Sequence, residues 1–478
     1  MTDITSTPPA TKRVRWDESV PHDAEQPAHA TVSSEAANPV SAEPSCNAND
    51  AIRLHGVRTA TDPSLESAAS ELGRIGFRPD FTHQLFDEER LEGYEDGDVT
   101  IELLHTATSL HWLVKVRTSD NDATRMADIM SRLSRTLPPA DYTTDEASFR
   151  GELEGGRRDF KPPGVRVFEY KRGATTFSVY RATGEDPGAS EYHARAQCLA
   201  PWFIEAADPI DLTDDRWEVF YLFEEETTRE VLGEKWRPAA LAGYFTLFGF
   251  RNPVKGVSLR ICQALILPQF QRQGHGQALL AFLYDLARSR DSVFEITVED
   301  PAPGFEKVRN LVDARTLRDS GAFPTELLSA GTFKRPSKDV IQAAHKAVKL
   351  TVAQTEIGFD ILKARDLQAA RGSRSPAAEA SLKGAPAPPT VATGLDLKAV
   401  AAAASDADEI CEDKRKQYRL MVKRRLLKRY GEELSTDAPT RKRQLEDLYR
   451  DLEPGFLSLG AKLLVVEKTT TAGRAEKA

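Results

Sequence analysis

The chain has 478 residues, too many for one compact core, so two or three folded units with polar tails are expected. Its 64 basic and 73 acidic side chains give a net charge of -9. That balance excludes a general attraction to DNA or to an anionic membrane surface, and it suits a basic partner instead.

The four cysteines, Cys46, Cys198, Cys262 and Cys411, lie far apart and form no CxxC pair. Such spacing predicts neither a disulfide framework nor a zinc site, and we expect no bound metal. No apolar run approaches the roughly 20 residues that cross a bilayer, and residues 1–50 lack the apolar core of a secretion signal. A soluble protein of the cytoplasm, the nucleus or both is therefore expected.

The amino-terminal part changes character near residue 50. Residues 1–50 are rich in Ala, Pro, Ser and Thr and poor in large apolar groups, which predicts a disordered tail. Strand-like patterns at residues 51–57, 98–105 and 110–116 then predict a mixed α/β domain over residues 51–200.

A second domain is expected over residues 201–335. Residues 219–223 and 240–250 read as two strands of a β-hairpin with a long polar loop. A strand, loop, helix and strand follow at residues 259–267, 269–274, 275–290 and 293–298. The helix repeats apolar residues at spacings of three and four, so one of its faces should lie on a sheet.

The carboxy-terminal third is predicted to be helical with one interruption. Residues 414–429 contain nine basic and no acidic residues, while Tyr418, Val422 and Leu426 recur every four positions. This pattern predicts an amphipathic helix that is packed in the fold and keeps a charged face in solvent. The expected segments are a helical extension (336–372), an Ala/Pro-rich flexible insert (373–408), a basic helical region (409–460) and a tail (461–478).

The segment Gln271-Arg272-Gln273-Gly274-His275-Gly276 follows a predicted strand and opens a predicted helix. Free backbone N–H groups and the positive end of the helix dipole favour anions at such a position. Two common phosphate loops are excluded, because Leu279 stands where a dinucleotide motif needs its third glycine and no GK[ST] follows. A glycine pair alone also fits an ordinary strand-to-helix turn.

The motif QxxGxG after an apolar strand resembles the acetyl-CoA loop of the GNAT superfamily of N-acetyltransferases. The stretches ILPQFQRQGHGQALL and FEITVEDP closely resemble the catalytic subunits of type B histone acetyltransferases. Weaker similarity extends to FTHQLF at residues 81–86, WFIE at 202–205, DDRW at 214–217 and YRLMVKRRLL at 418–427. The resemblance covers most of the chain, except the first tail and the Ala/Pro insert.

The resemblance implies an α+β fold with a GNAT-type mixed central sheet flanked by helices. It also implies acetyl-CoA as cosubstrate and no metal. The strand before the loop would hold the pantetheine arm by backbone hydrogen bonds, and the loop amides would hold the pyrophosphate. The residues implied are Ala264, Leu265 and Ile266, followed by Gln271, Arg272, Gln273, Gly274, His275, Gly276 and Gln277. His275 itself reads as a helix-start residue rather than a catalyst.

Acetyl transfer to lysine needs a base, because an amine with a pKa of about 10.4 is mostly protonated at neutral pH. Glu299 and Asp300 follow the last predicted strand, a position that alone fits a solvated turn equally well. The resemblance makes Glu299 the general base, with Asp300 and Glu205 as supporting carboxylates. We expect direct attack of the deprotonated lysine in a ternary complex, without an acyl-enzyme. Cys262 has no neighbour in the sequence that would activate a thiolate.

The segment 205–234 holds eleven acidic and two basic residues, which would attract a lysine-rich peptide or could be a solvated surface. The resemblance implies the amino-terminal tail of newly made, free histone H4 as substrate, a WD40-repeat histone chaperone subunit as partner, and both cytoplasm and nucleus as locations. The tail contacts it implies are Trp217, Phe248, Gly249 and Phe250, with Asp87, Glu88 and Glu89.

Two other functions stay open at this stage. An acetyltransferase of the same fold could act on small amines such as polyamines, although the large amino-terminal domain is superfluous for such a substrate. A histone escort without turnover could keep the fold, although the intact Glu299, Asp300 and glycine loop argue against it.

Overall fold

The computed structural model describes residues 44–66, 76–138, 140–225, 229–231, 234–236, 239–329, 331–372 and 397–475. All of these lie in one of the two units into which the chain divides, Pro44–Ala478. Residues 1–43 of the predicted tail lie outside the described residues. Strand β1 (Ser45–Asn47) and helix α1 (Ala48–Ala51) make residues 45–50 part of the fold rather than of that tail.

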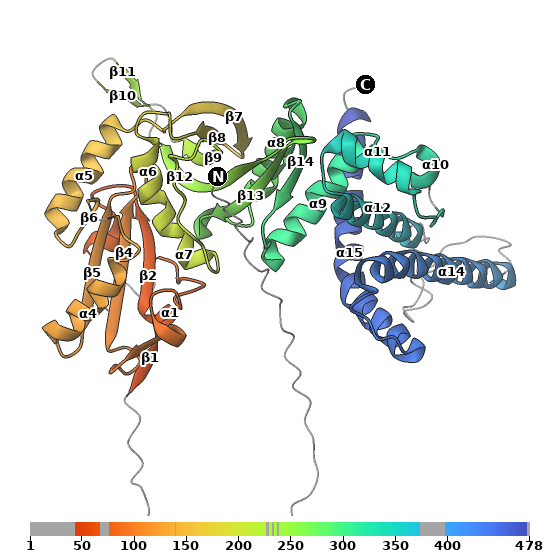
Figure 1. Ribbon diagram of the computed structural model, residues 1–478, viewed down its shortest axis with the longest axis horizontal. Coiled ribbons are helices and arrows are strands. Elements are labelled where there is room, and N and C mark those ends of the chain that lie inside the picture. Colours follow the sequence, from red (N-terminus) through yellow and green to blue (C-terminus); the bar gives the residue numbers. More distant parts are fainter. Residues whose placement is uncertain are drawn as a thin grey trace, which may run out of the picture. The chain divides into compact units, whose positions relative to one another are not determined.

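A four-stranded sheet forms the amino-terminal part (Figure 1), in the order β2-β4-β5-β6. The strands predicted at 51–57 and 98–105 are confirmed. The strand predicted from residue 110 begins at Trp112, because Leu110 has a φ of 62° and lies in the turn before it. The strands are β2 (Ile52–Val57), β4 (Val99–Thr106), β5 (Trp112–Thr118) and β6 (Tyr142–Thr143).

Smaller elements surround this sheet. Strand β3 (Arg90–Glu92) pairs with β1 in an antiparallel ribbon, next to the short helix η1 (Asp87–Glu89). The helices here are α2 (Pro63–Glu66), α4 (Ala123–Leu133) and α5 (Glu146–Asp159). Asp122 caps α4 and Asp145 caps α5 by accepting backbone N–H groups of the first turn, which explains where both helices begin.

The central sheet has six strands in the order β14-β13-β12-β9-β8-β7. All neighbours are antiparallel except β13 and β14, which are parallel. Together with the helices, this sheet confirms the predicted α+β class with a mixed central sheet. The strands are β7 (Val165–Arg172), β8 (Thr175–Ala182), β9 (Trp217–Glu225), β12 (Ala239–Asn252), β13 (Gly256–Ile266) and β14 (Val293–Val298).

Strands β7 and β8 are absent from the elements expected from the sequence. They form a hairpin around Gly173, whose φ of 56° suits the two-residue turn, and β8 pairs with β9. The central sheet therefore begins at Val165 and crosses the domain boundary predicted between residues 200 and 201. Strand β7 lies at the sheet edge with Val165 and Val167 exposed, and a register shift between Arg166 and Phe168 interrupts its alternation.

The hairpin predicted from residues 219–223 and 240–250 is confirmed as the antiparallel pair β9 and β12, both longer than predicted. Between them, β10 (Arg229–Val231) pairs with β11 (Glu234–Trp236). The helix predicted at 275–290 is confirmed as α8, which contacts β13, β14 and α9. The helices of this part are α6 (Ala189–Ala196), η2 (Gln197–Leu199), α7 (Ala200–Phe203), η3 (Pro268–Phe270), α8 (His275–Ser289), α9 (Pro303–Asp319) and α10 (Thr325–Leu328).

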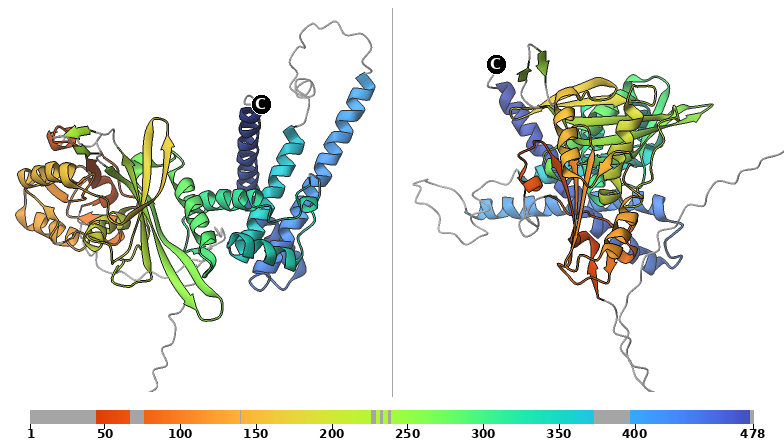
Figure 2. Two further views of the ribbon diagram at one scale, coloured as in Figure 1. Left: turned by 90° about the horizontal axis from the view of Figure 1, so that it is seen from above. Right: turned by 90° about the vertical axis from the view of Figure 1, so that its left-hand side faces the viewer.

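The carboxy-terminal helices form a group next to α9, drawn in teal and blue in the left view of Figure 2. They are α11 (Lys338–Val348), α12 (Val352–Gly372), α14 (Leu397–Tyr430) and α15 (Ala438–Ala475). Residues 373–396 of the predicted insert lie outside the described residues, whereas residues 397–408 belong to α14. Likewise, α15 continues through most of the predicted tail 461–478.

The basic segment 414–429 is a packed helix, as predicted. Tyr418, Val422 and Leu426 are buried against the neighbouring helices. The buried guanidinium of Arg425 donates to the Asp360 carboxylate on α12 at 2.6 Å, so one basic residue of this segment lies inside the helical region. Such a pair compensates two charges that would be costly to bury singly.

Candidate functional site

The loop from β13 to α8 ends in a helix start without a side-chain cap among the described residues. Gly274 occupies the N-cap position with a φ of 84°, and Arg272 also has a positive φ of 61°. The backbone thus turns through two left-handed residues directly before the helix. The N–H groups of the first helical turn have no intrahelical acceptors and carry the positive end of the dipole, which is a suitable site for a pyrophosphate.

His275 fixes this helix start instead of facing a ligand. Its ring is buried, lies 4.3 Å from that of Phe177 between centroids, and its Nδ1 lies 2.7 Å from the hydroxyl of Tyr170. Burial, and then the charge of Arg172, lowers the pKa of His275, so the ring is neutral at neutral pH. The predicted helix-start role of His275 agrees with these contacts.

Strands β13 and β14 separate halfway along β13. Their pairing ends at Ile261 and Val298, and the last bond runs from the Glu299 N–H to the Ile261 carbonyl at 2.9 Å. Beyond that point, β13 pairs only with β12 within the described part of the chain. This free edge includes the backbone of Ala264, Leu265 and Ile266, the residues predicted to hold the pantetheine arm. The Ile266 carbonyl also accepts a hydrogen bond from the Gln271 side chain at 2.9 Å.

A β-bulge marks the point of separation. The register between β12 and β13 shifts at Cys262, and the Gln263 N–H donates to the Thr246 hydroxyl at 2.9 Å instead of to a backbone carbonyl. Bulges redirect side chains and are common beside functional sites. Here the bulge lies across from the start of the segment that carries Glu299.

Glu299 and Asp300 begin the chain segment that leaves the sheet after β14. The Glu299 carboxylate is half exposed and lies 3.5 Å from Nη1 of Arg260. Burial, and then the nearby Glu299 charge, raises the pKa of the Cys262 thiol to about 12. This thiol is therefore protonated at neutral pH, which argues against an acyl-cysteine route. Asp300 has a φ of 27°, a conformation that fixes the sharp change of direction after the strand.

A buried glutamine on β13 holds the chain segment that carries Glu205. The Gln263 side-chain amide on β13 donates to the Asp208 carbonyl at 2.8 Å, which holds the segment after α7 against the strand. Glu205 itself is exposed at the start of that segment. In the described ranges no hydrogen bond or ion pair joins Glu205 to Glu299 or Asp300, so its supporting role stays a prediction.

The predicted tail contacts Trp217, Phe248 and Phe250 form one aromatic cluster. The ring centroids of Trp217 and Phe248 lie 4.7 Å apart, and those of Phe248 and Phe250 also lie 4.7 Å apart. Two arginines cover these rings, with Arg216 4.5 Å from the Phe248 centroid and Arg260 4.4 Å from that of Phe250. Gly249 lies between the two phenylalanines, and its N–H donates to the Arg216 carbonyl.

Asp87, Glu88 and Glu89 come from the amino-terminal part as helix η1. The nearby Asp80 and Phe81 N–H groups donate to the Trp202 carbonyl, so the FTHQLF and WFIE segments meet in the structure. Asp87 is fully exposed, whereas Glu89 accepts from the Asn49 side chain and the Thr82 N–H. Only part of this acidic group is thus available to a peptide.

The acidic segment 205–234 is partly neutralised by arginines from other elements. Glu218 is partly buried between Arg181 and Arg290, which together lower its pKa despite this burial. Asp215 pairs with Arg251 at 2.8 Å. The count of eleven acidic residues therefore overstates the charge that faces solvent.

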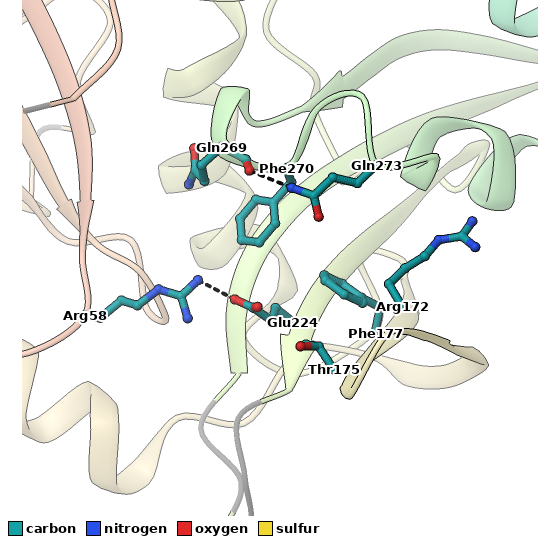
Figure 3. Close-up of a pocket in the computed structure, with 8 residues that line it drawn as sticks. All are labelled: Arg58, Arg172, Thr175, Phe177, Glu224, Gln269, Phe270 and Gln273. Carbon is teal, nitrogen blue, oxygen red and sulfur yellow. Dashed lines mark hydrogen bonds and ion pairs between the residues drawn. The ribbon is translucent and has the colours of Figure 1, made fainter.

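A cavity of about 390 Å³ lies between the β13 to α8 loop and the strands β8 and β9 (Figure 3). Gln273 is the one predicted cofactor residue among those that line it, and its side chain donates to the Gln269 carbonyl. Opposite the loop, an ion pair between Arg58 and Glu224 joins the amino-terminal part to β9. None of the predicted catalytic or tail residues lines this cavity, so we do not assign acetyl transfer to it.

The described residues contain neither a cluster of metal ligands nor a helix that could span a membrane. No group of three or more His, Cys, Asp or Glu side chains is arranged for a metal ion in the described residues. None of the helices in the same ranges is long and apolar enough to cross a bilayer.

Residues 44–205 match the family model described as histone acetyl transferase HAT1 N-terminus. A histone acetyltransferase type B catalytic subunit of Rattus norvegicus is 31% identical over 334 residues, which cover 67% of this chain and 75% of that protein. The Homo sapiens protein of the same description gives the same values. A Dictyostelium discoideum protein of that description is 28% identical over 301 residues, or 61% of this chain and 62% of the relative. The chain thus spans about three fifths of the length of the Dictyostelium relatives that it matches.

Proposed function

Because the chain belongs to the family of type B histone acetyltransferase catalytic subunits, we propose that it transfers acetyl groups from acetyl-CoA to lysine side chains of histones. The observation that carries the proposal is the position of Glu299. This carboxylate follows β14 at the point where β13 loses its partner, which supports a base beside the exposed part of that strand.

The free edge of β13 and the amides of the β13 to α8 loop offer the donors and acceptors that acetyl-CoA needs. Backbone groups of Ala264 to Ile266 suit the amides of the pantetheine arm. The amides from Gln271 to Gln277 suit the pyrophosphate at the helix start. The buried His275 contributes to this site by anchoring the helix start to β7.

We propose direct attack in a ternary complex. The Glu299 carboxylate takes a proton from the lysine ammonium, and the free amine attacks the thioester carbonyl. The C–S bond then breaks, coenzyme A leaves as a thiolate, and the proton that the nitrogen loses on forming the amide protonates this thiolate. Asp300 and Glu205 would hold the incoming ammonium. A positioned base of this kind contributes on the order of 10²–10⁴ in rate.

Among histone substrates, we propose the amino-terminal tail of newly made, free histone H4. A lysine-rich peptide suits the exposed Asp87 and Glu88 and the aromatic cluster of Trp217, Phe248 and Phe250.

We also propose a WD40-repeat histone chaperone subunit as partner and residence in both cytoplasm and nucleus, in line with the family. Co-purification from a cell extract and imaging of the tagged chain test these two points.

The test is acetyl transfer from labelled acetyl-CoA to histone tail peptides and to spermidine, with wild type and Glu299→Gln compared. We expect transfer to the H4 peptide and a loss of about 10²–10⁴ in turnover in the variant, with acetyl-CoA affinity kept. Unchanged turnover would reject Glu299 as the base. Spermidine as the only acceptor would favour a small-amine acetyltransferase, and tight tail binding without transfer would favour a histone escort.

A further inference from the structure

Arg260 stands between the predicted base and the predicted tail contacts. It lies on β13, two residues before the bulge at Cys262. Its guanidinium carbon lies 4.4 Å from the centroid of the Phe250 ring on β12, and its Nη1 lies 3.5 Å from Oε1 of Glu299 after β14. One side chain therefore links three chain segments that each carry a predicted site residue.

The contact with Phe250 restricts where the guanidinium can be. A planar guanidinium prefers to lie over an aromatic face, and this attraction is worth about 0.5–1 kcal/mol at exposed sites. The Phe250 ring is itself held by Phe248, which packs against Trp217. The guanidinium of Arg260 thus packs on this aromatic cluster, and its Nη1 faces the Glu299 carboxylate.

The Cys262 thiol is a weaker hydrogen-bond donor to the Glu299 carboxylate than Arg260 is. The Cys262 thiol also lies near this carboxylate, and its pKa is raised by burial and by the Glu299 charge. A protonated thiol is only a weak donor. Among the described residues, Arg260 is the cation paired with the Glu299 carboxylate, and its Nη1 faces Oε1.

We propose that Arg260 is a positioning residue that holds the Glu299 carboxylate in the orientation in which it accepts the proton of the substrate amine. This inference rests on the proposed function, because it assigns a role toward the base of that reaction. Arg260 acts through Glu299 and needs no contact with acetyl-CoA or with the acetyl group.

The same geometry would permit one opposite role. A cation over Phe250 and beside Glu299 could occupy the place of the substrate lysine and compete with it. The two roles differ in kinetics. Loss of a positioning residue lowers kcat, because misplacement of a reacting group by about 1 Å can cost about 10²-fold. Loss of a competitor lowers the KM for the peptide instead and leaves kcat unchanged.

The experiment compares Arg260→Met, Arg260→Lys and the control Lys255→Met. Lys255 also joins the β12 and β13 hairpin to β14, through a contact of 5.6 Å with the Phe294 ring, but it does not contact Glu299. The measurements are kcat and KM with an H4 peptide, the Kd of acetyl-CoA, and thermal unfolding. We expect Arg260→Met to lower kcat about 10- to 100-fold with unchanged Kd for acetyl-CoA, Arg260→Lys to restore part of it, and Lys255→Met to match wild type.

A double variant identifies the route of the effect. If Arg260 acts through Glu299, Arg260→Met in the Glu299→Gln background lowers the residual kcat no further. Additive losses, an unchanged kcat, or a lower peptide KM at unchanged kcat would overturn the positioning role. Inactive wild-type protein would instead reject the proposed function, and transfer that depends on Glu299 but not on Arg260 would reject only this inference.

Discussion

The hydroxyl of Tyr170 lies 2.7 Å from Nδ1 of His275, which ties the edge strand β7 to the first residue of α8. The loop that ends at this residue is the one predicted to hold the pyrophosphate. Strand β7 therefore stabilises a predicted ligand loop that lies about 100 residues further along the chain.

We expect Tyr170→Phe to lower the free energy of unfolding by about 1–2 kcal/mol, because it leaves the buried Nδ1 of His275 unpaired. The acetyl-CoA affinity should fall several-fold because the helix start is held less firmly. Urea unfolding and calorimetric titration measure both effects. Tyr180→Phe is the matched control, since the Tyr180 ring packs against Phe223 while its hydroxyl makes no hydrogen bond within the described residues.

The stability of the protein should fall as the pH drops from 6.5 toward 4. Burial lowers the pKa of His105 and of His193 to about 4, from 6.5. Below pH 6.5 the unfolded chain binds protons that the folded protein does not, so the stabilisation present above pH 6.5 is lost on acidification. The upper limit is about 3 kcal/mol for each histidine.

Asp313 works in the opposite direction. Burial raises its pKa to about 7, so the folded protein binds this proton before the unfolded chain does and gains stability as the pH falls below 7. His193→Gln isolates one histidine, because it leaves Asp313 unchanged. Urea unfolding at pH 7, 6 and 5 should give a flatter pH dependence for this variant, and parallel curves would contradict the assignment.

The part of the site that could be predicted is local in sequence. The strand, glycine loop, helix and strand from residue 259 to residue 298 follow from periodicity, from Gly274 and Gly276, and from Pro268 and Pro301 as end signals. Local rules determine such elements because each residue's partner lies within a few positions.

The remaining features depend on contacts between distant segments. Nothing adjacent to Arg260 shows that its guanidinium meets Phe250 and Glu299, since the three residues come from different strand ends. The sequence count of acidic residues likewise cannot show that Glu218 lies between Arg181 and Arg290. The edge strand β7 was missed because the alternation of apolar and polar residues changes phase between Val167 and Phe168, where the register with β8 shifts.

Neutralising Asp87 and Glu88 should weaken peptide binding without affecting the fold. Both side chains are exposed on η1, whereas Glu89 is excluded from the change because it supports the Thr82 N–H. The double variant Asp87→Asn with Glu88→Gln should raise the KM for an H4 peptide several-fold at low salt and little at high salt, because exposed charges are screened. Asp413→Asn with Asp447→Asn on the carboxy-terminal helices is the control, and an equal rise in KM there would point to net charge alone.

Replacing Gln263 with Leu should uncouple the Glu205 segment from β13. The change leaves the Asp208 carbonyl and the Tyr244 hydroxyl without their partner, at a cost of about 1–3 kcal/mol in unfolding free energy. We expect kcat to fall, since Glu205 then moves relative to Glu299. Tyr244→Phe removes only the longer bond of 3.4 Å and should have a smaller effect on both quantities. Equal kcat in Gln263→Leu and wild type would show that catalysis does not require Gln263 to hold the Glu205 segment against β13.

Gly276→Ala separates the need of the fold from the need of the ligand. A Cβ at residue 276 would meet only the Ile266 side chain, at 4.0 Å, and Gly276 has no positive φ. Because Ala favours helices over Gly, we expect the variant to be more stable by up to about 0.5–1 kcal/mol. If a pyrophosphate approaches this backbone, the added methyl group should nevertheless weaken acetyl-CoA binding at least 10-fold. Gly274→Ala is the contrasting control, since its φ of 84° makes any side chain costly to the fold itself. Calorimetric titration and urea unfolding of both variants decide the matter: a Gly276→Ala protein that is more stable and binds acetyl-CoA like wild type would remove this glycine from the cofactor site.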